Sequence, residues 1–432
     1  MTAQPPPDLA EGTPCYHRSS MRLLIVNQYG LPAGRPGITR HGDLGAQLVT
    51  LGHEVTVLAS RFNYLTRESE SGSAVERHSG VTFRWLDTGT YARNDARRVR
   101  SMLDFTLRAS WHGMRLRHRP DVVLASSPHL LTGLAGIAIA RRYRVPLLFE
   151  VRDLWPSVLV DLGAVREGSA AHRALLLVER LCYAQAERII TVPPHADRRV
   201  AEVGGDPRKC VHLPNATTLH GVEAAPLPGS MLEMFERIGE RDILMYAGAQ
   251  GVANGLDTLL QALVRLRATD RPAYDRLALV LIGGGGEHDR LVEMAGALEL
   301  GNVHFHAPID KAAIPTALAR ADFLLVSVAD SSVYQYGMSP NKLFDYMWAA
   351  RPVLLSSRLT DTPMNEAGAG RCFTPGSVES LATELRALIA MPLDERRSMG
   401  ERGRRLVEER YTIAATGARL DALLRDVAPR AA

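Results

Sequence analysis

Several common anchors of structure and function are scarce in this sequence. Its 432 residues include four cysteines, which lie far apart and form no Cys-x-x-Cys pair. This spacing excludes a disulfide framework and a cysteine-based metal cluster, and it predicts reduced thiols in a cytosolic protein. The most apolar stretch, residues 130–140, ends at Arg141 and is shorter than the ~20 residues that cross a bilayer. The formal net charge of +4 is too small for a chain that wraps nucleic acid through its charge.

The first 20 residues contain a proline run and polar residues but no apolar segment typical of a secretory signal. We expect residues 1–20 to be a disordered tail, and Met21 is a possible alternative start. The composition as a whole, 46% hydrophobic and 23% charged, is typical of a soluble globular protein. At this length the chain predicts two or more domains.

Short β-branched runs alternate with helical patterns from residue 21 onward. The alternation predicts an α/β fold made of two doubly wound parallel sheets, because strands that are apolar on both faces need helices on both sides. A second series of strands begins near Cys210. We place the N-terminal domain at residues 21–205, the C-terminal domain at 206–412 with a linker within 205–240, and a closing helix or tail at 413–432.

Glycine-rich turns follow several of the expected strands, where open α/β sheets bind ligands. Gly34 and Gly37 lie in the first turn, Gly248 lies in the second within residues 246–257, and residues 283–286 are four consecutive glycines. None of these turns has the Gly-x-Gly-x-x-Gly dinucleotide fingerprint, which argues against an NAD-linked dehydrogenase. A P-loop and a Gly-x-Ser-x-Gly elbow are also missing from the sequence.

Two further turns carry charged residues. The first, FEVRDLWP, places Glu150, Arg152 and Asp153 after a strand. In the second, SPNKLFDYM, Ser339 and Pro340 begin a helix whose free amides near Lys342 would face an anion. A capped helix with a surface lysine and aspartate is the alternative interpretation of that segment.

The sequence resembles the family-4 retaining glycosyltransferases of the GT-B fold, over residues 21–412. The bacterial branch that builds cell-surface polysaccharides, including N-acetyl-fucosamine-type transferases, is the most similar. The segments that carry the resemblance are GHEVTVLAS, FEVRDLWPSVLVDLGAV, LPNAT, YAGAQGVANGLDTLLQAL, LIGGGGEHDRL, SPNKLFDYMWAARPVL and EAGAGRCFTPGSVESLA.

The resemblance implies two Rossmann-like domains that face each other across a cleft, with the nucleotide sugar, UDP-linked in our prediction, in the C-terminal domain. The family's Glu-x7-Glu motif falls on Gly337 and Asp345, so the first glutamate is missing and Asp345 is expected to bind the ribose. A basic pair of the family is replaced by Ala249 and Asn254, so we expect Lys342 to neutralise the diphosphate. The residues expected to bind the donor are Gly37, Arg40, Gly248, Asn254, Gly283, Gly284, Pro308, Ile309, Gly337, Ser339, Asn341 and Asp345.

For the reacting centre, the resemblance implies Lys342, Arg152 and Asp153 as catalytic residues. The acceptor, a hydroxyl of a lipid-linked or polysaccharide precursor, is expected near Glu150, Arg152 and His129. Retention is usually explained in this family by attack on the front face, with the leaving diphosphate taking the acceptor proton. We expect no metal and no cofactor. A sugar-nucleotide-binding homologue without catalysis, acting as a partner or regulatory subunit, remains the alternative.

Residues 93–119 form a basic amphipathic segment. Such a helix can lie on anionic lipid, and an ordinary packed helix with a solvated basic face is the alternative. The family resemblance favours peripheral contact with the inner face of the plasma membrane by a cytoplasmic protein. The arginines of the segment 93–119 are Arg93, Arg97, Arg98, Arg100, Arg108, Arg115, Arg117 and Arg119.

Overall fold

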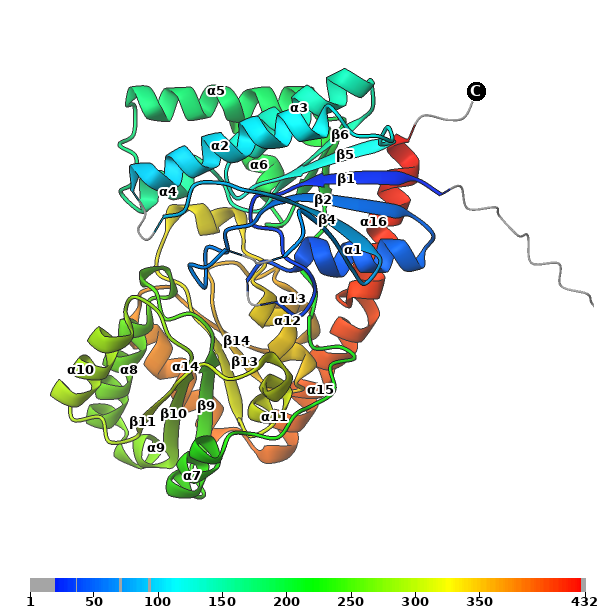
Figure 1. Cartoon of the computed structure of the whole chain (residues 1–432). Coiled ribbons are helices and arrows are strands. Elements are labelled where there is room, and N and C mark those ends of the chain that lie inside the picture. Colours follow the sequence, from blue (N-terminus) through cyan, green and yellow to red (C-terminus); the bar gives the residue numbers. More distant parts are fainter. Residues whose placement is uncertain (1–19, 36, 70–71, 92–94, 429–432) are drawn as a thin grey trace, which may run out of the picture.

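The computed structural model describes residues 20–35, 37–69, 72–91 and 95–428. Most of the predicted tail, with Cys15, and Arg93 of the basic segment therefore lie outside the described residues. Two parallel sheets, each covered by helices on both faces, stack one above the other in Figure 1. This arrangement confirms the prediction of two doubly wound sheets. Among the described helices, none is both long and apolar enough to span a membrane.

The N-terminal sheet has eight strands within the described residues, in the order β3-β4-β2-β1-β5-β6-β7-β8. Only β3 is antiparallel to its neighbour in this set. The central strands are fully buried because the helices of both layers cover them. The bounds are β1 Arg22–Val26, β2 Glu54–Ser60, β3 Val75–His78, β4 Val81–Leu86, β5 Val122–Ser126, β6 Leu147–Val151, β7 Arg188–Thr191 and β8 Cys210–His212.

The C-terminal sheet of the described chain has six parallel strands in the order β11-β10-β9-β12-β13-β14. The order reverses between β9 and β12, and in open parallel sheets such a switch point opens a crevice at the carboxyl ends of the strands. The bounds are β9 Asp242–Ala247, β10 Leu277–Ile282, β11 Val303–His306, β12 Phe323–Val326, β13 Val353–Ser356 and β14 Gly370–Phe373.

The helices pack on the sheets through their apolar stripes, as amphipathic surface helices do. The N-terminal layers contain α1 Arg40–Thr50, α2 Ala96–Gly113, α3 Leu131–Tyr143, α4 Ser157–Asp161, α5 Ala170–Gln185, α6 Ala196–Glu202 and η1 Pro207–Lys209. The rest are α7 Gly229–Ile238, η2 Val252–Asn254, α8 Leu256–Thr269, α9 Arg271–Arg276, α10 His288–Ala297, η3 Lys311–Ala313, α11 Ile314–Leu318, η4 Ser332–Tyr336, α12 Asn341–Trp348, α13 Pro363–Ala367, α14 Val378–Ala390, α15 Leu393–Arg410 and α16 Ile413–Val427.

The boundary between the domains differs from the prediction. Strand β8 pairs with β7, so it completes the N-terminal sheet instead of starting the second series at Cys210. Helix α7 lies inside the predicted linker and buries Met231, Met234 and Ile238 in the C-terminal core. The connection between the sheets and α7 is therefore residues 213–228.

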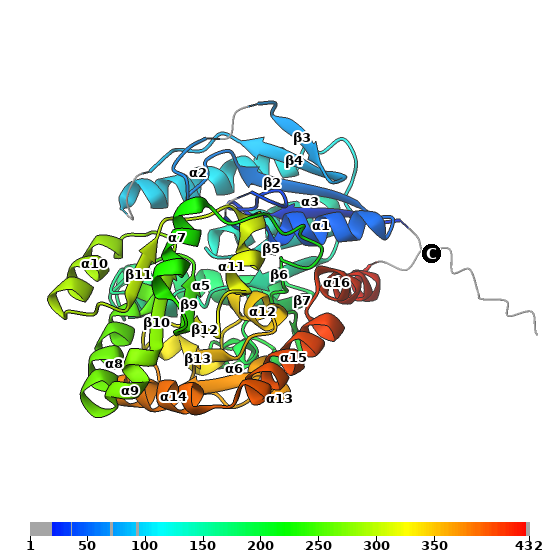
Figure 2. The ribbon, with the colours of Figure 1, turned by 90° about the horizontal axis from the view of Figure 1, so that it is seen from below.

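The last helix, α16, returns to the N-terminal domain. Figures 1 and 2 both show it beside α1, and its Leu420 and Leu424 join the core around β1. His53 and Asp421 are 2.7 Å apart at this contact. The chain thus crosses between the domains twice, once before α7 and once before α16.

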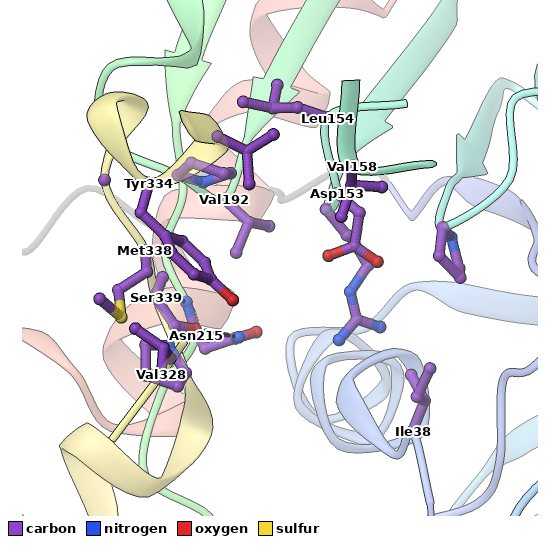
Figure 3. Close-up of a pocket in the computed structure, with 16 residues that line it drawn as sticks. Ile38, Asp153, Leu154, Val158, Val192, Asn215, Val328, Tyr334, Met338 and Ser339 are labelled. Atoms are coloured by element: carbon purple, nitrogen blue, oxygen red, sulfur yellow. Dashed lines mark hydrogen bonds between the residues drawn. The ribbon is translucent and has the colours of Figure 1, made fainter. Parts of the chain in front are cut away.

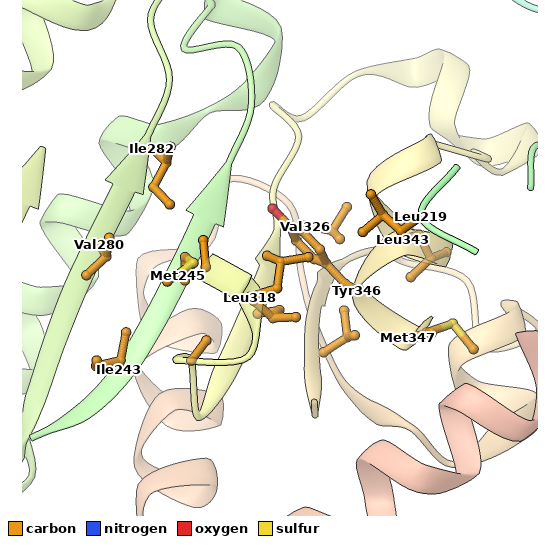
Figure 4. Close-up of a cluster of buried hydrophobic side chains, with 14 of the residues drawn as sticks. Leu219, Ile243, Met245, Val280, Ile282, Leu318, Val326, Leu343, Tyr346 and Met347 are labelled. Carbon is orange, nitrogen blue, oxygen red and sulfur yellow. The ribbon is translucent and has the colours of Figure 1, made fainter. Parts of the chain in front are cut away.

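Helix α12 is anchored firmly on the C-terminal sheet. Its inner face, with Leu343, Tyr346 and Met347, lies in the cluster drawn in Figure 4. The Tyr346 hydroxyl also accepts a hydrogen bond from the backbone N–H of Ala247 at 2.8 Å. Burial of one such large apolar side chain contributes about 1.5–3 kcal/mol to the free energy of folding. The N-terminus of α12 is consequently held at the carboxyl end of β9.

Candidate active site in the cleft between the domains

A hollow of about 280 Å³ lies where the carboxyl ends of the two sheets face each other. Its N-terminal wall includes Arg152 and Asp153, which follow β6, and its C-terminal wall includes Tyr334 and the residues from 337 to 340. Figure 3 shows Asp153 and Tyr334 on opposite walls. The structure thus brings Arg152, Asp153, Gly337 and Ser339 together, although the sequence places them in different domains.

The two walls are held together by hydrogen bonds across the cleft. Asn215 donates from its backbone N–H to the Ser339 hydroxyl at 2.9 Å, and its side-chain amide donates to the Ser339 carbonyl. Asp161, at the end of α4, accepts from the backbone N–H of Val333 at 3.2 Å and from two serine hydroxyls of the 331–333 segment. The cleft is therefore closed in this structure.

Arg152 lines the hollow and has one guanidinium nitrogen without a hydrogen bond to the described residues. Its Nη1 is buried and has no hydrogen-bond partner among the described residues. Burial lowers the pKa of Arg152, although the nearby Glu150 opposes this effect. Its backbone N–H donates to the Ser127 hydroxyl at 2.8 Å, which fixes the turn after β6. A guanidinium nitrogen that has no hydrogen bond to the described residues is suited to donate to an anionic or hydroxyl-bearing ligand.

Glu150 lies behind this wall and faces inward. It is 1% exposed and accepts hydrogen bonds from Arg40 at 2.9 Å, His41 at 2.8 Å and Ser126 at 2.6 Å. Burial would raise the pKa of Glu150, but the charges of Arg40 and His41 hold it well below its ordinary value. Glu150 does not line the hollow, and its carboxylate already accepts three hydrogen bonds, so this structure gives no support to the predicted contact of Glu150 with the acceptor.

Arg40 is likewise occupied. Besides Glu150, its guanidinium donates to the carbonyls of Leu213 and Pro214, both at 2.8 Å, and to the side chain of Asn215 at 3.3 Å. The sequence predicts that Arg40 closes on a donor phosphate. In the structure it holds the crossover between the domains instead, and so it positions Asn215.

His129 is also in the core and not on the wall of the hollow. Its ring is fully buried, and its Nε2 lies 2.7 Å from the side-chain oxygen of Gln28. Burial lowers the pKa of His129 to about 3, so the ring is neutral. His129 does not line the hollow, where its neighbour Pro128 forms the wall, so this structure does not support the predicted contact of His129 with an acceptor.

On the C-terminal side, Lys342 is the central cation. Its Nζ donates to the Tyr246 hydroxyl at 2.8 Å and lies 3.9 Å from the centre of that ring. No described carboxylate forms an ion pair with Lys342, and burial lowers its pKa to about 7. The ammonium lies under Gly248, where a Cβ atom would be 2.9 Å from Nζ. The site thus offers a desolvated cation at the N-terminus of α12, beside Asn341 and Ser339.

The two glycine turns of the C-terminal domain interlock. A Cβ atom on Gly283 would lie 2.1 Å from the carbonyl oxygen of Gly248, so a side chain cannot fit there. The backbone N–H of Gln250 donates to the Gly284 carbonyl at 2.8 Å. Pro308 lies next to Gly284, at 3.9 Å from its ideal Cβ position. The predicted donor-binding turns that contain Gly248, Gly283 with Gly284, and Pro308 therefore lie next to one another in space.

The remaining predicted donor residues take local structural roles. Asn254 bonds to the Gly251 carbonyl within η2, and Ile309 packs against the C-terminal core. Gly37 has a φ of +131° and precedes Ile38, which lines the hollow.

Asp345 faces the connection between the domains. Its Oδ1 accepts from the Thr217 hydroxyl at 2.9 Å and from the backbone N–H of Thr218 at 2.8 Å. Burial raises the pKa of Asp345 to about 6 despite these hydrogen bonds. Its other oxygen accepts no hydrogen bond from the described part of the chain, so that oxygen alone is available for the predicted contact with a ribose.

Gly337 packs against the other domain. Its φ is +81°, and a Cβ atom would lie 2.4 Å from Cγ of Pro194. The glutamate that the family resemblance places here has no room in this structure. This contact gives a physical reason for the departure from the motif.

Three residues of the site were not predicted: Asn215, Tyr246 and Tyr334. Asn215 belongs to the segment LPNAT, which carried the resemblance without a role for the asparagine. Tyr246 ends β9, so its place beside a strand-end turn was the available signal. Among the described residues, no group of three or more His, Cys, Asp or Glu side chains could hold a metal ion.

Comparisons with known families match both domains. Residues 37–216 match the family described as Glycosyl transferase 4-like domain, and residues 234–406 match Glycosyl transferases group 1. Together the two matches cover most of both sheets.

Two curated relatives illustrate the range of similar sequences. A D-inositol 3-phosphate glycosyltransferase of Catenulispora acidiphila is 26% identical over 65% of this chain and 67% of its own length. A putative colanic acid biosynthesis glycosyl transferase of Escherichia coli, WcaI, is 22% identical over 81% of this chain and 88% of its own. The match to a second D-inositol 3-phosphate glycosyltransferase, from Geodermatophilus obscurus, spans only 62% of that protein.

Solved structures share the fold. Sucrose-phosphate synthase from Thermosynechococcus elongatus has a TM-score of 0.73 at 17% identity, covering 94% of this chain and 98% of the other. HepE of Anabaena in complex with UDP-glucose has a TM-score of 0.66 at 14% identity, covering 94% and 100%. The two-domain arrangement of this chain is therefore the GT-B fold.

Proposed function

The chain belongs to the glycosyltransferases built from a glycosyl transferase 4-like domain and a group 1 domain, and from this premise we propose that it transfers a sugar from a nucleotide diphosphate sugar to a hydroxyl acceptor. The observation that carries the proposal is Lys342, a desolvated ammonium at the N-terminus of α12 that forms no ion pair with a carboxylate of the described residues. A buried charge without a counterion lowers the stability of the ligand-free protein, because its desolvation costs free energy. A bound anion offsets that cost.

The diphosphate would lie in front of Lys342. The first backbone N–H groups of α12 point out of the helix, and its N-cap residue, Pro340, makes no side-chain hydrogen bond to them. Helix N-termini carry partial positive charge and bind phosphate groups. Gly248, which has no side chain over Lys342, allows the phosphates to approach both the ammonium and these amides. We infer that this countercharge replaces the basic pair and makes a metal ion unnecessary.

The nucleoside would extend from this point across the C-terminal domain. Gly284 and Pro308 lie together on one side, and Asp345 follows Lys342 by one turn of α12. A carboxylate oxygen is suited to accept hydrogen bonds from ribose hydroxyls. A UDP donor is supported by the complexes of HepE with UDP-glucose and of a trehalose-6-phosphate protein of E. coli with UDP-2-fluoro glucose.

Transfer would proceed in the hollow between Arg152 and the C-terminal wall. The acceptor oxygen bonds to the anomeric carbon, the bond from that carbon to the phosphate oxygen breaks, and the acceptor proton passes to the leaving diphosphate. We propose that attack occurs on the same face, so that configuration is retained. Lys342 stabilises the departing charge, and Arg152 with Asp153 orients the acceptor; electrostatic stabilisation of this kind is commonly the largest contribution in such sites.

The acceptor we propose is a precursor of a cell-surface polysaccharide, carried on a lipid. Support comes from WcaI, which is described as a putative colanic acid biosynthesis glycosyl transferase. WbjE of Pseudomonas aeruginosa, a probable glycosyltransferase, is 24% identical over 68% of this chain and 72% of its own length. The D-inositol 3-phosphate glycosyltransferases point instead to a small phosphorylated acceptor. The two classes of acceptor can be compared directly in one assay.

A screen of nucleotide sugars tests the proposal. Ligand binding raises the unfolding temperature by mass action, so UDP-, GDP- and dTDP-sugars are first ranked by thermal shift. The ranked donors are then incubated with the protein with and without EDTA, and nucleoside diphosphate release is measured. We expect release that EDTA does not change. Binding without release from any donor or acceptor would support the non-catalytic alternative, and the absence of binding would contradict the proposal.

A further inference from the structure

A second hollow, of about 480 Å³, adjoins the hollow between the domains. The two hollows share Tyr334 and Met338, which Figure 3 shows on the C-terminal wall of the first one. The other walls of the second hollow come from residues 330–332 and 335 around η4, and from residues 357–359 and 375 after β13 and β14. Sites for small molecules commonly have volumes of about 300–1,000 Å³. The second hollow is therefore large enough for a small ligand that continues from the first hollow across Tyr334.

The walls of the second hollow combine apolar and polar side chains. Met338, Leu359 and Pro375 supply apolar contacts, and Tyr334 adds an aromatic ring. The amide of Gln335, an exposed residue, supplies hydrogen-bond donors and an acceptor. A sugar has an apolar C–H face that packs on aromatic and aliphatic side chains, and hydroxyl groups that bond to amide, carboxylate or guanidinium groups. This combination of walls is therefore suited to a saccharide.

The charges of the second hollow balance each other. Its charged lining residues, Arg358 and Asp330, form an ion pair at 2.9 Å, and their side chains are 58% and 55% exposed. The pair uses one guanidinium nitrogen and one carboxylate oxygen, and the other polar atoms of the two side chains form no hydrogen bond to the described residues. One cation beside one anion attracts neither a phosphate nor an ammonium group strongly. A neutral ligand rich in hydroxyl groups fits these walls best, because it can bond to both side chains.

The second hollow lies away from the proposed nucleoside site. Gly284 and Pro308, beside which the nucleoside is proposed to lie, follow β10 and β11, whereas the second hollow lies beyond β12, β13 and β14. The order β11-β10-β9-β12-β13-β14 places these two groups of strand ends on opposite sides of the switch point. A donor whose diphosphate lies at Lys342 reaches the first hollow with its sugar. The ligand that continues into the second hollow is therefore the acceptor.

The η4 wall of the second hollow is held in place by the N-terminal domain. Asp161 of α4 accepts hydrogen bonds from the Ser332 hydroxyl at 3.0 Å and from the backbone N–H of Val333 at 3.2 Å. Ser331, whose hydroxyl also donates to Asp161, lines the second hollow together with Ser332. Both hollows therefore depend on the same closed arrangement of the two domains.

We propose that the second hollow is a saccharide subsite, which binds the sugar next to the reacting one in an acceptor of at least two sugar units. The reacting sugar lies in the first hollow beside Arg152 and Asp153, and the linkage between the two sugars crosses Tyr334. Arg358 and Asp330 bond to hydroxyl groups of the second sugar. The proposal rests on the transferase activity proposed above and adds a class of acceptor. It also requires that an earlier glycosyl transfer supplies the second sugar of that acceptor.

Binding of defined saccharides tests the subsite without any turnover. The probes are methyl glycosides of glucose, galactose, mannose, rhamnose and N-acetylglucosamine, disaccharides of the same sugars, and inorganic phosphate. Dissociation constants are measured by ligand-observed NMR with the full chain, with and without UDP. The variants are Arg358→Ala and Asp330→Asn. Arg265→Ala is the matched control, because Arg265 forms another exposed ion pair of the C-terminal domain, at 2.7 Å from Glu379. Circular dichroism verifies that each variant is folded.

We expect at least one disaccharide to bind at least about tenfold more tightly than the methyl glycosides of its component sugars. Arg358→Ala and Asp330→Asn should remove this advantage and leave the binding of single sugars unchanged, because the lost hydrogen bonds involve charged groups. Arg265→Ala should bind as wild type does. The proposal would be overturned if no disaccharide binds more tightly than its components, or if both variants keep the advantage. Phosphate that displaces the disaccharide from wild type but does not bind to Arg358→Ala would assign the hollow to an anion instead.

Turnover separates the subsite from the proposed activity. With the donor selected by thermal shift and the disaccharide that binds most tightly, Arg358→Ala should raise the KM for the acceptor about tenfold and leave kcat and the KM for the donor unchanged. An unchanged acceptor KM in an active Arg358→Ala variant would overturn the subsite alone. A protein that binds disaccharides through Arg358 but releases no nucleoside diphosphate from any donor would support the saccharide subsite and contradict the proposed function.

Discussion

The ammonium of Lys342 lies over the ring of Tyr246, 3.9 Å from its centre, and donates a 2.8 Å hydrogen bond to the hydroxyl of the same residue. That hydroxyl in turn donates to the Ala249 carbonyl at 2.6 Å. These contacts orient the ammonium but leave its charge uncompensated, which is why burial lowers the pKa of Lys342 to about 7. The proposed diphosphate would supply the missing charge and raise this pKa again.

Replacement of Lys342 by methionine should stabilise the free protein. The pKa of Lys342 is about 7 in the folded state and 10.5 ordinarily, so the unfolded chain binds more protons between these values and stability rises with pH. The loss of stability caused by the desolvated ammonium of Lys342 is fully present below pH 7. Thermal unfolding from pH 6 to pH 10 should show Lys342→Met above wild type at pH 6, with the difference shrinking towards pH 10. A constant difference would mean that the ammonium is not desolvated.

Arg152→Ala and Glu150→Ala should separate function from stability. Arg152 has a buried nitrogen without a hydrogen bond to the described residues, so Arg152→Ala should unfold at the same urea concentration as wild type, or a higher one, while turnover falls at least about tenfold. Glu150→Ala leaves Arg40 and His41 buried without their carboxylate and should cost about 3–5 kcal/mol. An equal loss of stability in both variants would contradict the assignment of a functional role to Arg152 and a structural role to Glu150.

Gly337→Ala should destabilise the contact between the domains. The new methyl group would collide with Pro194, and the backbone at Gly337 is of a kind essentially restricted to glycine. We expect a loss of about 2–3 kcal/mol in urea unfolding. Gly376→Ala is the matched control, because Gly376 also has a positive φ, of +71°, but its nearest neighbour is 3.5 Å away. Comparable losses in both variants would assign the effect to backbone strain alone.

Asp345→Asn should raise stability and weaken nucleotide binding. The pKa of Asp345 is raised to about 6 from 3.8, so the carboxylate reduces stability as the pH rises through this interval, and the full penalty remains above pH 6. The asparagine keeps an oxygen for Thr217 and Thr218. We expect a higher unfolding temperature at pH 7.5, none of this gain near pH 4, and about tenfold weaker binding of UDP by calorimetry. Unchanged UDP affinity would leave Asp345 with a structural role only.

The sequence predicted the two sheets and the glycine turns because both depend on local patterns. Strand runs followed by Gly248 or Gly283 and then by a helical pattern are visible within about twenty residues. The interlocking of these two turns was not predictable, since it depends on strands β9 and β10 being neighbours. Strand β8 was misassigned for the same reason, because its three residues reveal no partner.

Charged residues at strand ends gave a weaker signal. Glu150 and Arg152 are two positions apart and have the same sequence signal. Glu150 nevertheless accepts a hydrogen bond from Arg40, 110 residues away, whereas one nitrogen of Arg152 has no hydrogen bond to the described residues. Such pairing over long sequence distances decides which charges are structural. Helix α7 was missed because its short apolar pattern stands among proline, glycine and acidic residues.

The central claim is that Lys342 stabilises the leaving diphosphate during sugar transfer. It is tested most directly by the turnover of wild type, Lys342→Ala and Lys342→Arg with the donor selected by the thermal-shift screen, measured as release of nucleoside diphosphate. We predict that turnover of Lys342→Ala is lower by at least ~100-fold, on the scale of the loss of one oxyanion donor, with partial recovery in Lys342→Arg. Turnover of Lys342→Ala close to that of wild type would contradict the account.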